Sequence, residues 1–203
     1  ILTHIRHSEK VFIMNRLLLI LILTFSFQTL TKADDIRDFQ IEGISIGDSL
    51  LNHFSKSQIK ANSVYDYYLN IKKNPGKFYA IDIDDFDGDD FSILQISVKK
   101  GDSKYKVYMI KGIIPFKDDM DGCLKKRNEI NKSLSEIFLN LEKEEFTRKL
   151  TPDTGKIMSI TYWFEKNDII DVDCYDWSKK SGYFDQLRIG ATSYEFNDWL
   201  TEK

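Results

Sequence analysis

A short apolar segment at residues 17–27 most constrains what this chain can fold into. It follows Met14 and Arg16, and polar residues after it end in the small residue Ala33. A basic start, an apolar centre and a small terminal residue are typical of a secretory signal peptide. The apolar centre of eleven residues is also short for a membrane-spanning helix, which needs about 20. We therefore predict that residues 14–33 are a cleaved signal peptide and that no transmembrane segment remains.

This prediction divides the chain into three parts. Residues 1–13 begin without methionine, and we interpret them as encoded upstream of the natural start. Residues 34–203 are then expected to form a single α+β domain, since 170 residues suffice for one hydrophobic core. The mature protein is expected to be periplasmic or secreted and soluble after cleavage near Ala33.

Removal of the first 33 residues makes the protein more acidic. The segment takes four basic residues and one acidic residue with it, so the formal net charge changes from −3 to −6. Nucleic-acid binding and docking on anionic lipid both depend on positive charge. We therefore expect no nucleic-acid partner.

The histidine content limits the catalytic mechanisms that are open to the mature chain. Of three histidines only His53 lies after Ala33, so a two-histidine zinc site is excluded and any Ser-His or Cys-His catalysis would require His53. A solvated or capping role is the simpler interpretation of His53. No phosphate-binding loop, nucleophile elbow or metal-ligand spacing is present, so we expect no cofactor and no metal.

Apolar periodicity predicts an α+β fold with antiparallel sheet. Alternating apolar residues indicate strands, while apolar residues at helical spacing indicate one long central helix packed on the sheet. A capping box with Thr192 as N-cap and Glu195 three residues later predicts the start of the last helix. A linker is expected to follow the long helix and to run through residues 151–155. The expected order is α-βββ-α-βββ-α: a strand and short helix over 39–54, strands at 79–83, 94–98 and 105–109, the long helix at 121–141, strands at 157–164, 169–177 and 186–192, and a helix at 193–201.

The hairpin around residues 166–168 has a preferred register. A three-residue loop there would pair Phe164 with Ile170 and Ile160 with Cys174, which keeps the apolar residues on one face. A two-residue loop would mix apolar and polar residues on both faces. The three-residue loop is therefore expected.

Two cysteines remain in the mature chain, and their positions predict a disulfide. Cys123 lies seven residues before Ile130, on the apolar face of the predicted long helix, and Cys174 shares a strand face with Ile170 and Val172. In an exported protein such a pair is usually bonded. Two separate buried thiols are the alternative.

The acidic run at residues 82–90 suggests a calcium loop at first sight. If Gly88 takes the sixth position of an EF-hand loop, the first and twelfth positions fall on Ile83 and Leu94, where carboxylates are needed. A solvated loop between two strands is the simpler interpretation, because Asp and Gly are common turn residues.

The outward face of the second set of strands carries the best candidate binding residues. In the expected register Trp163 lies opposite Asp171 and Thr161 opposite Asp173, with Tyr175 further along the strand. Aromatic and carboxylate groups together can bind sugars or cations, or perform acid–base chemistry. A solvated face with no ligand is the alternative.

The segments EGISIGDSLL and EFNDWL, together with the cysteine in the long helix, resemble a group of small exported proteins of free-living marine alphaproteobacteria. The resemblance covers residues 39–200. It implies export and a shared fold, and it brings no active site with it.

These observations favour a non-enzymatic binding or envelope-associated module whose partner is a protein, a peptide or a small molecule. A carboxylate-dependent hydrolase acting on envelope or sugar substrates is the second hypothesis. A calcium-stabilised structural domain is the third.

Overall fold

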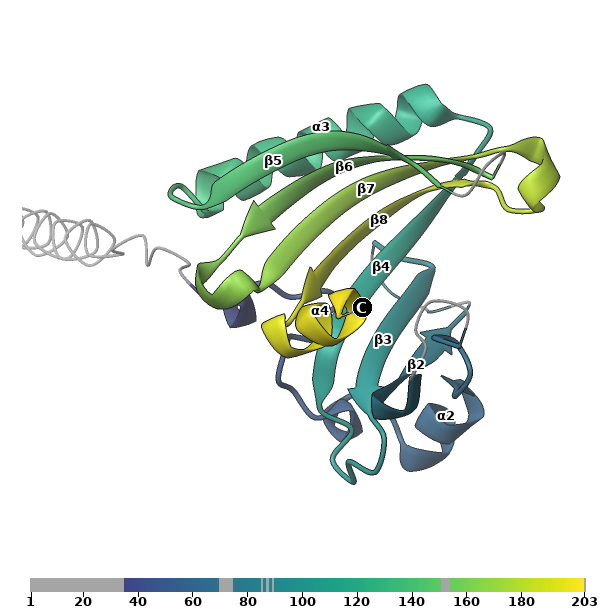
Figure 1. The fold of residues 1–203 in the computed structure, drawn as a ribbon, viewed down its shortest axis with the longest axis vertical. Coiled ribbons are helices and arrows are strands. Elements are labelled where there is room, and N and C mark those ends of the chain that lie inside the picture. The colour runs from purple at the N-terminus through teal and green to yellow at the C-terminus, as the bar shows by residue number, and fades with distance from the viewer. Residues whose placement is uncertain are drawn as a thin grey trace, which may run out of the picture. The chain divides into compact units, whose positions relative to one another are not determined.

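One antiparallel sheet of eight strands forms the body of the protein in a computed structural model (Figure 1). The structure describes residues 35–69, 75–84, 86, 88, 90–150 and 154–202. The predicted signal peptide at 14–33 and the residues before it lie outside this part. None of the described helices is long and apolar enough to cross a membrane.

The strands lie in the order β1-β2-β3-β4-β8-β7-β6-β5. The chain builds β1 to β4 side by side, crosses the sheet through helix α3, and returns inward from the edge strand β5 to β8, which pairs with β4. The strands are β1 (Ser63–Val64), β2 (Phe78–Ile83), β3 (Ile93–Lys99), β4 (Val107–Lys117), β5 (Glu142–Lys149), β6 (Gly155–Trp163), β7 (Ile169–Trp177) and β8 (Asp185–Thr192).

Helices pack on both faces of this sheet. Helix α3 (Met120–Ile137) contacts β4, β7 and β8, and the main apolar core lies between it and the sheet. Helix α4 (Tyr194–Thr201) covers an aromatic cluster on the other face, where Phe196 and Trp199 contact Phe78. The remaining described helices are α2 (Lys56–Ala61) and the short 3-10 helices η1 (Ile36–Asp38), η2 (Leu50–Asn52), η3 (Pro75–Lys77), η4 (Glu165–Asn167) and η5 (Lys179–Ser181).

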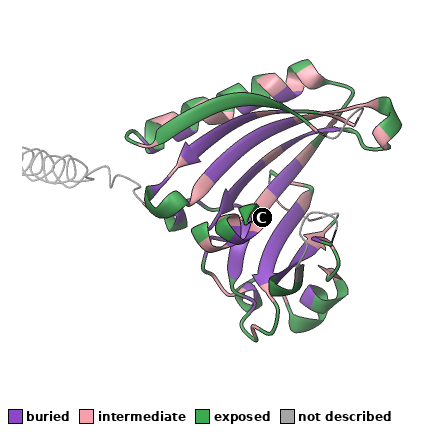
Figure 2. Cartoon of the chain, in the orientation of Figure 1, coloured by how far each residue is buried: buried purple, intermediate pink, exposed green. Residues whose placement is uncertain are grey.

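The antiparallel α+β class is as predicted, but the predicted order of elements is wrong. The structure has two strands that the periodicity does not reveal, β1 and β5. Strand β5 occupies part of the expected linker, and every one of its side chains is exposed (Figure 2). Charged side chains on an edge strand show no apolar alternation, so this strand resembles a polar loop in sequence.

The limits of several other elements also differ from the prediction. The strand expected at 105–109 is β4, which begins at Val107 and continues to Lys117. Over residues 39–54, where a strand and a short helix are expected, the structure has isolated β-bridges and the 3-10 helix η2, and an α-helix begins only at Lys56 in α2.

Helix α3 ends at Ile137, four residues earlier than expected, because the next residue, Phe138, leaves the helical conformation and is buried in the core. Helix α4 is capped by Ser193 and not by Thr192, since Thr192 is paired within the sheet as the last residue of β8. Glu195 forms no capping box and instead pairs with Lys99 at 2.5 Å.

The predicted register of the β6–β7 hairpin is wrong by two residues. Tyr162 lies opposite Ile170, and Thr161 opposite Asp171. The loop runs from Phe164 to Asp168 and includes helix η4, in which Lys166 has a positive φ of 68°. A shift of two residues keeps each side chain on its predicted face, so only the cross-strand partners change.

Candidate functional site

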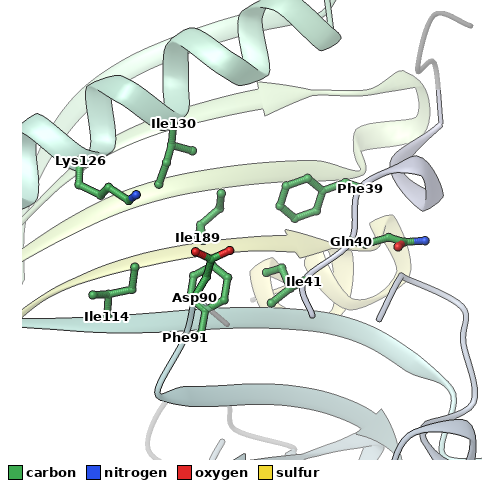
Figure 3. A pocket seen from close by; sticks show the side chains of 9 residues that line it. All are labelled: Phe39, Gln40, Ile41, Asp90, Phe91, Ile114, Lys126, Ile130 and Ile189. Carbon is green, nitrogen blue, oxygen red and sulfur yellow. The ribbon is translucent and has the colours of Figure 1, made fainter. Parts of the chain in front are cut away.

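A pocket of about 230 Å³ lies on the α3 side of the sheet (Figure 3). Its walls come from the N-terminal segment, the segment before β3, strands β4 and β8, and helix α3. Most of the lining side chains are apolar, and three are polar. The lining residues are Phe39, Gln40, Ile41, Asp90, Phe91, Ile114, Lys126, Ile130 and Ile189.

A tight turn holds the N-terminal wall of this pocket. Ile41 and Ile44 exchange backbone hydrogen bonds of 3.0 and 2.9 Å around Glu42 and Gly43. Both turn residues have positive φ, 50° and 75°, which is the backbone conformation that a two-residue hairpin turn requires. The turn therefore fixes where Ile41 enters the pocket.

Glu42 also connects this wall to the segment before β3. Its Oε1 accepts hydrogen bonds from the backbone N–H groups of Asp90 at 3.0 Å and Phe91 at 3.3 Å. The ring of Phe91 lies against Gly112 of β4, where a Cβ atom would come within 2.5 Å of it. These contacts place Phe91 over β4 as the second wall.

The polar groups at the pocket are of opposite charge. The side chain of Lys126 extends from α3 over the pocket, and the carboxylate of Asp90 lies next to Ile189 (Figure 3). Both residues are exposed, and neither takes part in an ion pair among the described residues. The site thus combines an apolar interior with a cation and a carboxylate at its rim, neither of which is in an ion pair with another described residue.

The predicted disulfide is confirmed, and it anchors the helix that forms one wall. Cys123 in the first turn of α3 is bonded to Cys174 of β7, with a Cα–Cα distance of 6.0 Å, and both side chains are fully buried. Ile130 follows two helical turns after Cys123. The bond therefore holds the start of α3 close to the sheet next to the pocket.

The predicted binding residues lie on the opposite face of the sheet, and the structure brings only some of them together. Asp171 and Asp173 lie side by side, with Tyr175 next along β7. Trp163 lies opposite Ile169, at the far end of the hairpin from Tyr175. The side chains of Asp171 and Asp173 are only 9% and 8% exposed. These two carboxylates are therefore buried, and the alternative of a solvated face does not apply to them.

A row of polar residues and one glycine crosses the sheet at Asp171. We call it the polar row: Glu144, Thr161, Asp171, Gly190, Lys111, Gln95 and Asp82, each directly opposite the next on neighbouring strands. Lys111 Nζ donates to Asp171 Oδ1 at 2.8 Å and lies 3.8 Å from Asp173 Oδ2. Gln95 donates to Asp82 at 3.1 Å.

Burial shifts the pKa values of several of these groups. Desolvation, and secondly the charge of Asp171, raise the pKa of Asp173 to about 7, although Lys111 and Ser159 act in the opposite direction. Burial alone would lower the pKa of Lys111, but the two neighbouring carboxylates outweigh it and raise that pKa above its ordinary value. Burial also raises the pKa of Asp82 and of Tyr175.

No family model, curated protein or solved structure matches this chain.

The remaining sequence candidates are placed only in part. His53 ends helix η2, with its Nε2 4.0 Å from Asp48. In the acidic loop, Asp85, Asp87 and Asp89 lie outside the described residues. Within the described part of the chain, no three His, Cys, Asp or Glu residues are grouped so as to hold a metal ion.

The pocket itself is absent from the sequence predictions. Its walls come from five segments that are far apart in the chain, so no local motif marks it. One available signal was the presence of Phe86 and Phe91 in and beside the acidic loop, since large aromatic residues are unusual in a fully solvated loop.

Proposed function

We propose that the protein is an exported, non-enzymatic binding module that holds a small, mainly apolar molecule in the pocket between α3 and the sheet. The pocket itself is the observation that supports this proposal. Small-molecule sites are concave and mostly apolar, with a few polar groups that orient the ligand. Lys126 and Asp90 at the rim are such groups.

The size of the pocket limits the ligand. A cavity of about 150 Å³ is known to bind benzene. A pocket of about 230 Å³ therefore suits a molecule of one or two rings or a short acyl chain. A polar substituent of the ligand would stay near the rim, where Lys126 and Asp90 are exposed.

Export is supported by the signal-peptide pattern of residues 14–33 and by the disulfide, since disulfides persist mainly in oxidising compartments. The resemblance to small exported bacterial proteins points in the same direction.

A carboxylate-dependent hydrolase is the second candidate, and the raised pKa of Asp173 is the observation that favours it. Access opposes it, because the side chain of Asp173 is only 8% exposed and a substrate would have to reach it through Lys111 and its neighbours. The binding module therefore agrees better with the geometry.

Indole is a suitable probe for the pocket, because it has an apolar ring system and one polar N–H. We expect the backbone amide NMR signals of Ile41, Phe91 and Ile189 to shift on titration with indole. The variant Ile130→Trp fills the pocket and is expected to abolish these shifts. Ile137→Trp is the matched control, since Ile137 is 50% exposed on the same helix and does not line the pocket.

Equal indole binding by Ile130→Trp and the wild-type protein would contradict the proposal. If Ile130→Trp does abolish binding, mass spectrometry under native conditions, on protein purified from its own envelope, would identify the natural ligand by its mass.

A further inference from the structure

The face of the sheet opposite the pocket contains two carboxylates that share one lysine. We propose that Asp171, Asp173 and Lys111 form a proton-binding centre, in which the folded protein holds one proton on the carboxylate pair at neutral pH and loses stability when that proton leaves. This inference is independent of the proposed function, because none of the three residues lines the pocket.

The two carboxylates are not compensated equally. Asp171 accepts a hydrogen bond of 2.8 Å from Lys111, whereas Asp173 Oδ2 is 3.8 Å from the same ammonium group. Asp173 Oδ1 is buried and has no hydrogen-bond partner among the described residues that meets normal geometry. A buried carboxylate with so few partners favours its neutral form.

Arg188 could neutralise Asp173, but the two side chains form no ion pair, and the buried Nε of Arg188 has no hydrogen-bond partner among the described residues. Arg188 lies directly opposite Asp173 on β8, yet its guanidinium group lies over the ring of Tyr175, 4.3 Å from the ring centroid. Among the described residues Arg188 forms no ion pair. The closest cation to Asp173 is therefore the lysine that already bonds to Asp171.

Among the described residues, the titratable groups that face Asp173 come from three strands. Asp171 and Tyr175 are its neighbours on β7, Lys111 comes from β4, and Arg188 comes from β8. On the other side β6 presents the hydroxyl of Ser159, and β5 beyond it presents Phe146. In the described part of the chain, Arg188 is the one charged residue directly opposite Asp173, and Ser159 and Phe146 on the other side carry no charge.

The consequence for stability has a definite sign. The pKa of Asp173 is higher in the folded protein than in the unfolded chain, where it is near 4. The folded state then binds more protons between the two values, so the contribution of Asp173 to stability is full below about pH 4 and is lost as the pH rises through about 7. This trend is opposite to that of a salt-bridged aspartate.

Urea unfolding at a series of pH values between about 5 and 8.5 tests this centre. We expect the wild-type midpoint to fall across this range. Asp173→Asn is expected to remove that fall and to give a midpoint above that of the wild type at the alkaline end. Asp176→Asn is the matched control, because Asp176 lies on the same strand but on the other face and pairs with Lys156 at 3.2 Å.

Parallel pH profiles of the wild type and Asp173→Asn would overturn the proposal, and so would a control variant that also loses the pH dependence. If Asp173→Asn does not fold, the carboxyl carbon of Asp173 can be titrated by NMR in the wild-type protein. A midpoint near neutrality is expected there, and a midpoint near 4 would overturn the proposal.

Discussion

Lys111 on β4 reaches Asp171 on β7 across an intervening strand, and Gly190 occupies the crossing point. The two charged atoms are 2.8 Å apart, and Gly190 lies directly opposite both residues. A Cβ atom at position 190 would lie 2.5 Å from Lys111 Cγ and 2.6 Å from the carbonyl oxygen of Ile110. The glycine thus provides the space in which the lysine side chain crosses the sheet.

The variant Gly190→Ala should therefore break this ion pair. We expect a loss of about 3 kcal/mol in the free energy of unfolding, because a buried charge is left without its partner. Urea denaturation measures this loss. Gly182→Ala is a useful control, since Gly182 has open space around it but a positive φ of 76°, and it should cost only about 1 kcal/mol. Equal losses of stability in both variants would show that the ion pair of Lys111 and Asp171 does not depend on the glycine at position 190.

Removal of the lysine should also destabilise the protein, in a manner that depends on pH. Lys111→Met leaves Asp171 and Asp173 buried without their shared cation, and we expect a loss of about 3–5 kcal/mol near neutral pH. The loss should be smaller near pH 5, because a protonated Asp173 needs no counter-charge. Lys106→Met, at an exposed lysine of the same region, should change stability by less than about 0.5 kcal/mol. A pH-independent loss in Lys111→Met would argue against this explanation.

Reduction of the Cys123–Cys174 bond should lower the free energy of unfolding by about 4 kcal/mol. Any strain that the bond imposes on the folded protein would make this loss smaller. The bond spans 51 residues, and closing a loop of that length restricts the unfolded chain by this amount in the chain-entropy model. Thiol labelling of the native, oxidised protein should find both cysteines blocked. Urea unfolding with and without reductant gives the change in stability, and identical midpoints would contradict the prediction.

Glu42 should control the order of one pocket wall. Glu42→Ala removes the acceptor for the N–H groups of Asp90 and Phe91, and we expect faster hydrogen exchange at both amides together with a stability loss of about 1 kcal/mol. Glu42→Gln keeps an oxygen acceptor at the same place and should behave like the wild type. If both variants exchange equally fast, the side-chain hydrogen bonds do not hold this wall.

Strands with apolar residues at every second position are predicted well from the sequence. In β2, β3, β6, β7 and β8 these residues face the main core beneath α3, although α4 or neighbouring polar side chains bury much of the other face as well. β5 is missed because both of its faces are exposed, and its place in the sheet depends on backbone pairing with β6. Backbone pairing by itself requires no apolar alternation in the sequence.

The candidate sites also differ in whether local sequence patterns could predict them. The disulfide could be predicted, since helical and strand periodicities place Cys123 and Cys174 on faces that meet. The shared face of Asp171, Asp173 and Tyr175 could also be predicted, since side chains alternate along a strand. The pocket could not, because residues such as Phe39, Ile130 and Ile189 meet only when the whole chain is folded.

The sequence by itself determined the antiparallel α+β class, the faces of most strands and the pairing of the two cysteines, because all three depend on local periodicity. Only the tertiary structure decided that Asp171 and Asp173 are buried. Their environment is set by Lys111 and Gly190, which lie far away in the chain and next to them in the sheet. The polarity that surrounds a side chain is a property of its neighbours in space, and local periodicity does not contain it.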